Sequence, residues 1–112
     1  MPAAPTSLRF TLPAPLRTRT LKVLAKIDGD PDPERHAEDL CSLVLALTES
    51  GMDFYFLRAV ADAKLGFVAR QTASLGVAGA VRVMSPIVHS VLGGADAAKL
   101  KAVSKHIRRL LV

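Results

Sequence analysis

Hydrophobic residues recur at helical spacing close to both ends of the chain. Near the N-terminus, Leu21, Leu24 and Ile27 lie on one face of a helix expected over residues 16–27. Near the C-terminus, Asp96 is expected to cap a basic helix, because an Asp side chain accepts hydrogen bonds from the free N–H groups of a first helical turn. The inner face of this last helix consists of Leu100, Val103, Ile107 and Leu110.

A second helix is expected to begin at Pro33 and to end near Ser50. Proline is favoured at the first helical position, and Gly51 is typical of the residue that follows a helix. Apolar residues in this segment follow the i, i+3, i+4, i+7 pattern, and additional leucines widen the stripe beyond one face. These residues are Ala37, Leu40, Cys41, Leu43, Val44, Leu45 and Leu47.

The stretch from Asp53 to Leu92 contains no cluster of turn residues, and Asp53 is expected to cap it. As one helix, these 40 residues would be about 60 Å long. A compact domain of this size has a radius of gyration of only about 13 Å. We therefore expect a break near residues 76–79, which begin and end with glycine, and a bend at Pro86.

These elements predict an all-α protein. The expected fold is an antiparallel bundle of four or five helices that occupies residues 16–112 as a single domain. Residues 1–15 contain four prolines and are expected to form an irregular N-terminal arm. The Arg- and Thr-rich composition of the N-terminus also resembles a transit peptide, but the prolines disfavour the amphipathic helix of such a segment.

Composition agrees with close helix packing in a reducing compartment. Half of the 112 residues are apolar, with Ala, Leu and Val prominent, and tryptophan is absent. The single cysteine, Cys41, excludes an internal disulfide, and we expect a cytoplasmic protein.

Charge is strongly segregated along this basic chain. Residues 1–27 carry five bases and no acid, whereas residues 28–53 carry eight acids and one base. Basic residues dominate again in residues 54–95 and 96–112. We expect the acidic second helix to lie beside the two basic terminal helices, because complementary charge favours such neighbours.

An acidic run over residues 28–34 raises the question of a metal loop. Asp28, Asp30 and Asp32 match the first three alternate ligand positions of a calcium loop. However, Pro31 and Pro33 hold φ near −65° where such a loop must curl, and Pro33 occupies the position that requires glycine. We therefore expect no metal site here.

A helix start explains the same acidic residues better. Asp32 and Pro33 match an N-cap followed by a first helical residue. Glu34, Glu38 and Asp39 would then lie near the positive end of the helix dipole.

Candidate catalytic side chains do not form a recognisable motif. His36, His89 and His106 belong to three different expected helices, and their spacing matches no metal site. His89 shares a helix face with Arg82 and Ser85, but a polar stripe is the preferred interpretation. Cys41 lies within an apolar stripe and is interpreted as a core residue. We expect a non-enzymatic protein without a cofactor.

Apolar residues exceed what a small bundle can bury. Of residues 40–92, 32 of 53 are apolar, which is more than the three in seven that a bundle helix needs. The longest uncharged runs, 71–81 and 83–95, are shorter than the 18–20 residues of a membrane span. Because Arg82 interrupts them, we expect no transmembrane segment.

Self-association is the favoured explanation of this surplus. Small residues recur at steps of three and four from Ala59 to Ala80, where they would allow helix backbones to approach closely, while larger apolar side chains occupy the other faces. The expected self-association surface comprises Phe56, Ala59, Val60, Ala63, Gly66, Phe67 and Ala73. Packing within one monomer and an apolar ligand between helices are the alternatives.

The sequence thus predicts an interaction or scaffold protein that forms a homo-oligomer, with an unidentified protein as a further partner. The alternative is a basic surface that binds an anionic membrane or nucleic acid through the terminal helices. Its candidate residues are Lys101, Lys105, Arg108 and Arg109.

Overall fold

Helices account for nearly all of residues 10–111, the part of the chain that the computed structural model describes. No strand occurs in that part, so the all-α prediction is confirmed. The elements are α1 (Ala14–Gly29), η1 (Pro33–His36, a 3-10 turn), α2 (Ala37–Met52), η2 (Asp53–Leu57, a π-helical turn), α3 (Arg58–Asp62), α4 (Phe67–Gly93) and α5 (Ala97–Leu110).

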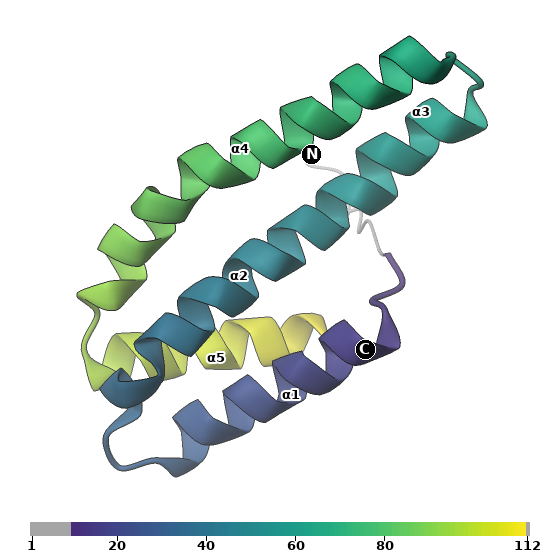
Figure 1. Cartoon of the computed structure of the whole chain (residues 1–112). Helices are drawn as coiled ribbons and strands as arrows, with labels where there is room; N and C mark the ends of the chain where they lie inside the picture. The colour runs from purple at the N-terminus through teal and green to yellow at the C-terminus, as the bar shows by residue number, and fades with distance from the viewer. Residues whose placement is uncertain (1–9, 112) are drawn as a thin grey trace, which may run out of the picture.

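A long helical hairpin rises from a smaller helical base (Figure 1). We call α2, η2, α3 and α4 the hairpin, because α2, η2 and α3 form one rod and α4 returns alongside it. We call α1, η1, α5 and the first half of α2 the base. The turn between the two arms of the hairpin, with the ends of both arms, is the tip (residues 58–70).

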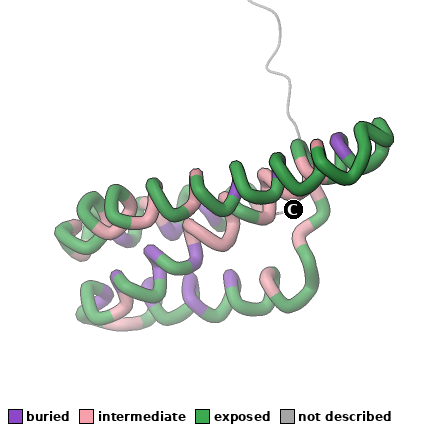
Figure 2. The backbone as a smooth tube through the Cα atoms, turned by 45° about the horizontal axis from the view of Figure 1, so that its top comes forward, coloured by how far each residue is buried: buried purple, intermediate pink, exposed green. Residues whose placement is uncertain are grey.

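The hydrophobic core lies almost entirely in the base. Leu24 and Ile27 of α1 meet Leu40 and Leu43 of α2 and Leu100 of α5, all fully buried. Ion pairs also join the expected acidic and basic segments, between Lys26 and Asp39 at 3.8 Å and between Arg108 and Asp28 at 2.8 Å. Figure 2 shows that the hairpin beyond the first half of α2 contains far fewer buried residues than the base.

The predicted end of the second helix is wrong. The chain remains helical through Gly51 and passes by the π-helical turn into α3, which ends at Asp62. Asp53 therefore lies inside a helical rod, where it pairs with Arg58 at 3.4 Å instead of capping a new helix. Phe10 packs against Phe54 and Tyr55 of this π-helical turn, with ring centroids 5.7 Å away in both pairs.

The predicted break near residues 76–79 is also wrong. The chain reverses at residues 63–66, where Lys64 has a φ of 54° and Gly66 a φ of 99°. The long helix α4 then continues through Gly76, Gly79 and Pro86 to Gly93. A lone glycine that adopts positive φ makes this turn, and no cluster of turn residues marks it in the sequence.

The other two predicted helix caps, Asp32 and Asp96, have different outcomes. Asp96 accepts a hydrogen bond from the Lys99 backbone N–H at 2.9 Å, so this cap is confirmed. Pro33 begins η1 as expected, but the Asp32 side chain caps nothing. Instead, Asp30 accepts a hydrogen bond from the Asp32 backbone N–H at 2.8 Å.

The N-terminal boundary differs slightly from the expected one. Helix α1 begins at Ala14, so Ala14 and Pro15 of the expected irregular arm are helical. Residues 1–9 of that arm lie outside the described residues.

Candidate interaction surfaces

The outward face of α4 exposes apolar side chains along the hairpin. Of the 27 residues of α4, only Ala73 and Val77 are buried. A stripe at steps of three and four, which we call the outward stripe, carries no charge and is exposed throughout, although Arg82 lies beside it. It consists of Thr72, Gly76, Gly79, Val83, Ile87 and Ser90.

Two glycines of this stripe serve no purpose in the packing of one chain. A Cβ atom added at Gly76 or Gly79 would meet no atom within 4 Å. Glycine within a helix costs about 1 kcal/mol relative to alanine. The monomer would therefore be more stable with alanine at both positions. The absence of a side chain at Gly76 and Gly79 leaves room for the close approach of another molecule.

The residues of the expected self-association surface do not form one surface. Val60 and Ala73 are buried within the hairpin, and Gly66 lies in the turn. The exposed members of the set are Phe56, Ala59, Ala63, Gly66 and Phe67, which belong to both arms of the hairpin and to the turn between them. The small-residue series from Ala59 to Ala80 thus crosses the turn instead of following one helix.

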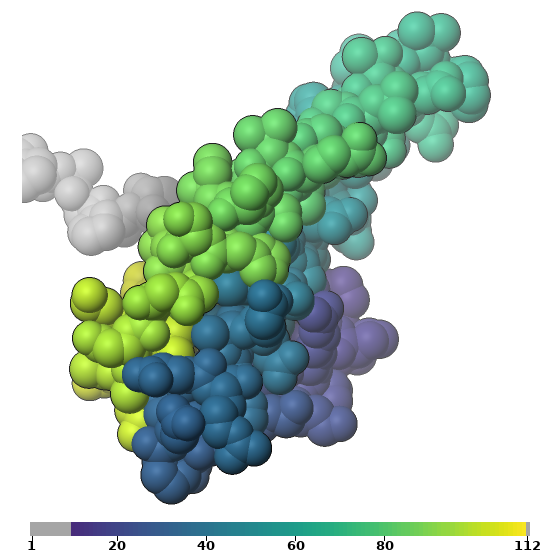
Figure 3. Space-filling model, turned by 60° about the vertical axis from the view of Figure 1, so that its left-hand side comes forward, coloured from purple at the N-terminus to yellow at the C-terminus, as the bar shows by residue number. Residues whose placement is uncertain are grey.

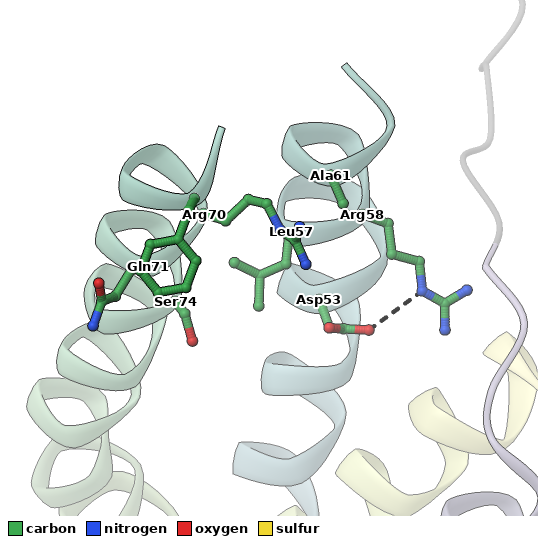
Figure 4. A pocket seen from close by; sticks show the side chains of 8 residues that line it. Asp53, Leu57, Arg58, Ala61, Arg70, Gln71 and Ser74 are labelled. Atoms are coloured by element: carbon green, nitrogen blue, oxygen red, sulfur yellow. Dashed lines mark ion pairs between the residues drawn. The ribbon is translucent and has the colours of Figure 1, made fainter. Parts of the chain in front are cut away.

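An open groove lies between the two arms close to the tip (Figure 4). Its volume is about 480 Å³, and Leu57, Ala61 and Phe67 supply the apolar part of its lining. Arg70 extends across the groove toward Leu57, while Arg58 points away and pairs with Asp53. The other lining residues are Gln71 and Ser74.

The basic residues proposed for an anionic partner lie on α5, whose buried face packs in the base. Lys101, Lys105 and Arg109 are exposed. Arg108 instead donates a hydrogen bond to Asp28 at 2.8 Å, which partly neutralises its charge. Three of the four residues are therefore free of ion pairs within the described part of the chain.

Cys41 lies in the environment of a core residue. The side chain is buried, and its Sγ atom is 3.8 Å from the Val88 carbonyl oxygen. Burial raises the pKa of the Cys41 thiol, and the Glu38 carboxylate raises it further. A thiol with a raised pKa is a poor nucleophile, which agrees with the interpretation from sequence.

Two histidines bind carboxylates at the base end of the hairpin. His89 of α4 contacts the Ser85 carbonyl oxygen through Nδ1 at 2.8 Å and Glu38 of α2 through Nε2 at 3.2 Å. His36 contacts Asp30 at 2.8 Å. The hydrogen bond from the Asp32 backbone N–H and the one from His36 hold the pKa of Asp30 below its usual value.

Neither arrangement forms a metal centre. Within residues 10–111, no three His, Cys, Asp or Glu side chains converge so that they could hold an ion. The acidic run is instead divided among separate contacts. Asp28 binds Ser104 and Arg108, whereas Asp30 binds the Asp32 backbone and His36.

Two helical stretches are long and apolar enough to cross a membrane, by length and composition alone. They are Pro33–Asp62 and Phe67–Gly93. The core helix of a soluble protein passes the same test, so the expectation that the chain has no transmembrane segment stays a prediction.

Sequence reasoning missed both the outward stripe and the tip. The surplus of apolar residues was visible in the sequence. The stripe and the tip were not, because the direction in which each side chain points depends on where the chain reverses. The pair Gly76 and Gly79, read as a break, was the available signal for the stripe. No protein-family model, curated protein or solved structure matches this chain.

Proposed function

We propose that this protein is a non-enzymatic interaction module that self-associates through the outward stripe of α4. In the proposed homodimer, the stripes of two hairpins pack against each other. The two hairpins together then form an antiparallel four-helix bundle across the dimer, whereas the bundle expected from the sequence lay within one chain. The observation that carries the proposal is that only Ala73 and Val77 are buried in the 27 residues of α4.

Burial of apolar side chains would drive the association. Val83 and Ile87 of the stripe, with Leu75 and Val91 beside it, are all more than half exposed. Complete burial of such side chains contributes about 1.5–3 kcal/mol each. In a two-fold symmetric pair every contact occurs twice, so a few residues supply a large share of the required free energy.

The stripe also has the shape that close helix pairing needs. At Gly76 and Gly79 no side chain separates the helix backbone from an approaching neighbour, and the space beside both residues is open. The larger side chains Val83 and Ile87 then pack around this close approach. A second copy of the chain fits the stripe because both surfaces are uncharged.

Light scattering on a size-exclusion peak tests the proposal, with one variant and a matched control. Gly79→Leu places a bulky side chain where the monomer has open space, so it should preserve the helical circular dichroism and weaken the dimer. Gly29→Leu is the control, because Gly29 of α1 also has open space around its Cβ position but lies in the base. This control should dimerise like the wild type.

The opposite results would overturn the proposal. A wild-type protein that stays monomeric at high micromolar concentration excludes self-association. Equal effects of Gly79→Leu and Gly29→Leu would place the contact elsewhere. Gly66 is unsuitable for this test, because its φ of 99° strains any side chain.

A basic surface on α5 is the second candidate. The exposed side chains of Lys101, Lys105 and Arg109 favour it, because they give α5 a positive surface next to α1, which also carries a net positive charge. Binding to an anionic polymer would weaken steeply as salt rises. Retention on heparin that Lys101→Gln/Lys105→Gln abolishes would support this function, and absence of retention at low salt would exclude it.

Cytoplasmic localisation and the absence of a cofactor belong to the same proposal. A buried cysteine with a raised thiol pKa is compatible with a reducing compartment. A further protein partner would compete with the second copy for the outward stripe.

A further inference from the structure

The tip of the hairpin exposes large apolar side chains that the described residues leave uncovered. Leu65 is 60% exposed, and Phe67 and Val68 are both 75% exposed. The tip projects beyond the rest of the molecule (Figure 3), so α1 and α5 lie too far away to cover it. Among residues 10–111, Phe67 and Val68 are the most exposed of the large hydrophobic residues, although neither belongs to the outward stripe.

Positive charge surrounds these apolar side chains. The tip carries Arg58, Lys64 and Arg70, whereas Asp62 is its one acid. Arg58 already pairs with Asp53 at 3.4 Å and lies over the Phe54 ring at 5.3 Å. Lys64 and Arg70 form no ion pair with any described residue. The free charge at the tip is therefore positive and lies within a few residues of Leu65, Phe67 and Val68.

The groove close to the tip combines the same two chemistries. Leu57, Ala61 and Phe67 give it an apolar wall, and Arg70 extends its guanidinium group across the opening (Figure 4). A guanidinium group binds phosphate oxygens through paired N–H donors. An amphipathic anion, with a phosphate next to a hydrocarbon chain, matches this arrangement.

We propose that the tip docks on an anionic phospholipid surface. Leu65, Phe67 and Val68 enter the boundary between headgroups and acyl chains, and Lys64 and Arg70 contact the headgroup phosphates. This inference goes beyond self-association, because it uses the turn and not the outward stripe. It also differs from the basic surface of α5, because the tip unites cations with exposed apolar side chains.

The shape of the tip favours lipid over a protein partner. A protein would need a concave site that matches a protruding turn, whereas a lipid surface deforms around it. The nearby cations have long stems that let their charged groups stay at the headgroups while apolar neighbours lie deeper. Charge complementarity therefore selects an anionic lipid as the occupant.

Vesicle sedimentation tests the electrostatic part. Wild-type protein should bind vesicles of phosphatidylcholine with phosphatidylserine more tightly than vesicles of phosphatidylcholine alone. Each basic residue near an anionic surface contributes about 1 kcal/mol, or roughly fivefold in affinity. Lys64→Gln/Arg70→Gln should therefore bind about 30-fold more weakly, whereas the control Arg35→Gln, which removes an exposed base of η1, should bind like the wild type.

Fluorescence tests the insertion, because the chain contains no tryptophan. Phe67→Trp introduces a single reporter at the tip, Val83→Trp one on the outward stripe, and Leu110→Trp one on α5. Only the tip reporter should shift its emission to the blue with anionic vesicles and be quenched by brominated acyl chains.

Several results would overturn the proposal. These are no binding of wild-type protein to anionic vesicles, loss of binding in Lys101→Gln/Lys105→Gln of α5 but not in Lys64→Gln/Arg70→Gln, or quenching of Val83→Trp to the same extent as Phe67→Trp. Light scattering on Lys64→Gln/Arg70→Gln separates this inference from the proposed function. If this variant still dimerises but no longer binds vesicles, the result supports both the dimer and the lipid-binding tip. If the wild-type protein dimerises but does not bind vesicles, the result rejects only the lipid-binding tip.

Discussion

At the scale of single residues, His89 makes two contacts that can both be hydrogen bonds only when its imidazole is protonated. Its Nδ1 faces the Ser85 carbonyl oxygen at 2.8 Å, and its Nε2 faces a Glu38 carboxylate oxygen at 3.2 Å. Both partners are acceptors, but a neutral imidazole carries one N–H group. The hydrogen bond to Ser85, and the nearby Glu38 carboxylate, raise the pKa of His89 above its usual value.

This geometry predicts a pH-dependent contact between α2 and α4. A group with a raised pKa in the folded state stabilises the fold below its unfolded pKa, and this contribution is lost as pH rises through the folded value. Glu38→Gln should therefore lower the melting temperature more at about pH 6 than at about pH 9. The effect should be small, because both side chains are accessible to solvent.

Thermal denaturation followed by circular dichroism measures this difference. Glu49→Gln is the control, because Glu49 is an exposed residue of α2 outside the described histidine contacts. If Glu38→Gln lowers the melting temperature equally at both pH values, the contact with Glu38 does not stabilise the charged form of His89.

At the scale of elements, one turn decides the shape of the hairpin. The rod from α2 to α3 ends at Asp62, and the chain reverses over residues 63–66. Gly66 adopts a φ of 99° and a ψ of 167°, a region of backbone space that is essentially restricted to glycine. The second arm then runs for 27 residues without interruption.

Alanine substitutions at two glycines should have opposite effects on stability. Gly66→Ala should cost about 1–3 kcal/mol, because it forces a side chain into a strained backbone conformation. Gly76→Ala should raise the stability of the monomer by about 0.4–1 kcal/mol, because its Cβ enters open space within a helix. Urea denaturation at a dilute protein concentration measures both changes. A similar effect of the two substitutions would place the turn elsewhere.

At the scale of the whole molecule, burial is unequal between the base and the hairpin. The radius of gyration is 16.2 Å, whereas a compact chain of this length is expected near 13 Å. The difference reflects the hairpin, whose outer part buries only Val60, Ala73 and Val77. In the base, α1, α2 and α5 together form the hydrophobic core.

Hydrogen exchange should follow this division. Segments with few buried contacts open more readily, so amides of the tip should exchange faster than amides around Leu24, Leu40 and Leu100. If α4 forms the dimer contact, protection in residues 72–90 should also increase with protein concentration. Equally slow exchange at the tip and in the base of a dilute sample would contradict the unequal burial.

Local sequence signals succeeded where a residue acts on its own backbone. Asp96 caps α5 as predicted because the cap involves only neighbouring N–H groups. Asp32 has the same local signature, but Asp30 reaches the Asp32 N–H group and also binds His36 of η1. The path of the connection between α1 and η1 decides which Asp side chain makes the contact. The spacing of residues in the sequence does not specify that path.

The sequence by itself determined the helical class, the surplus of apolar side chains and most of the apolar faces of α1 and α5. Two members of those predicted faces, Leu21 and Leu110, are nevertheless exposed. Periodicity encodes these properties, because a helix repeats every 3.6 residues wherever it lies. Only the tertiary structure decided that Gly51, Gly76 and Gly79 continue a helix and that Gly66 lies in the turn before one. A glycine permits many backbone conformations, so packing around it selects among them. That selection decides which apolar side chains enter the core of the base and which remain exposed on the outward stripe and at the tip.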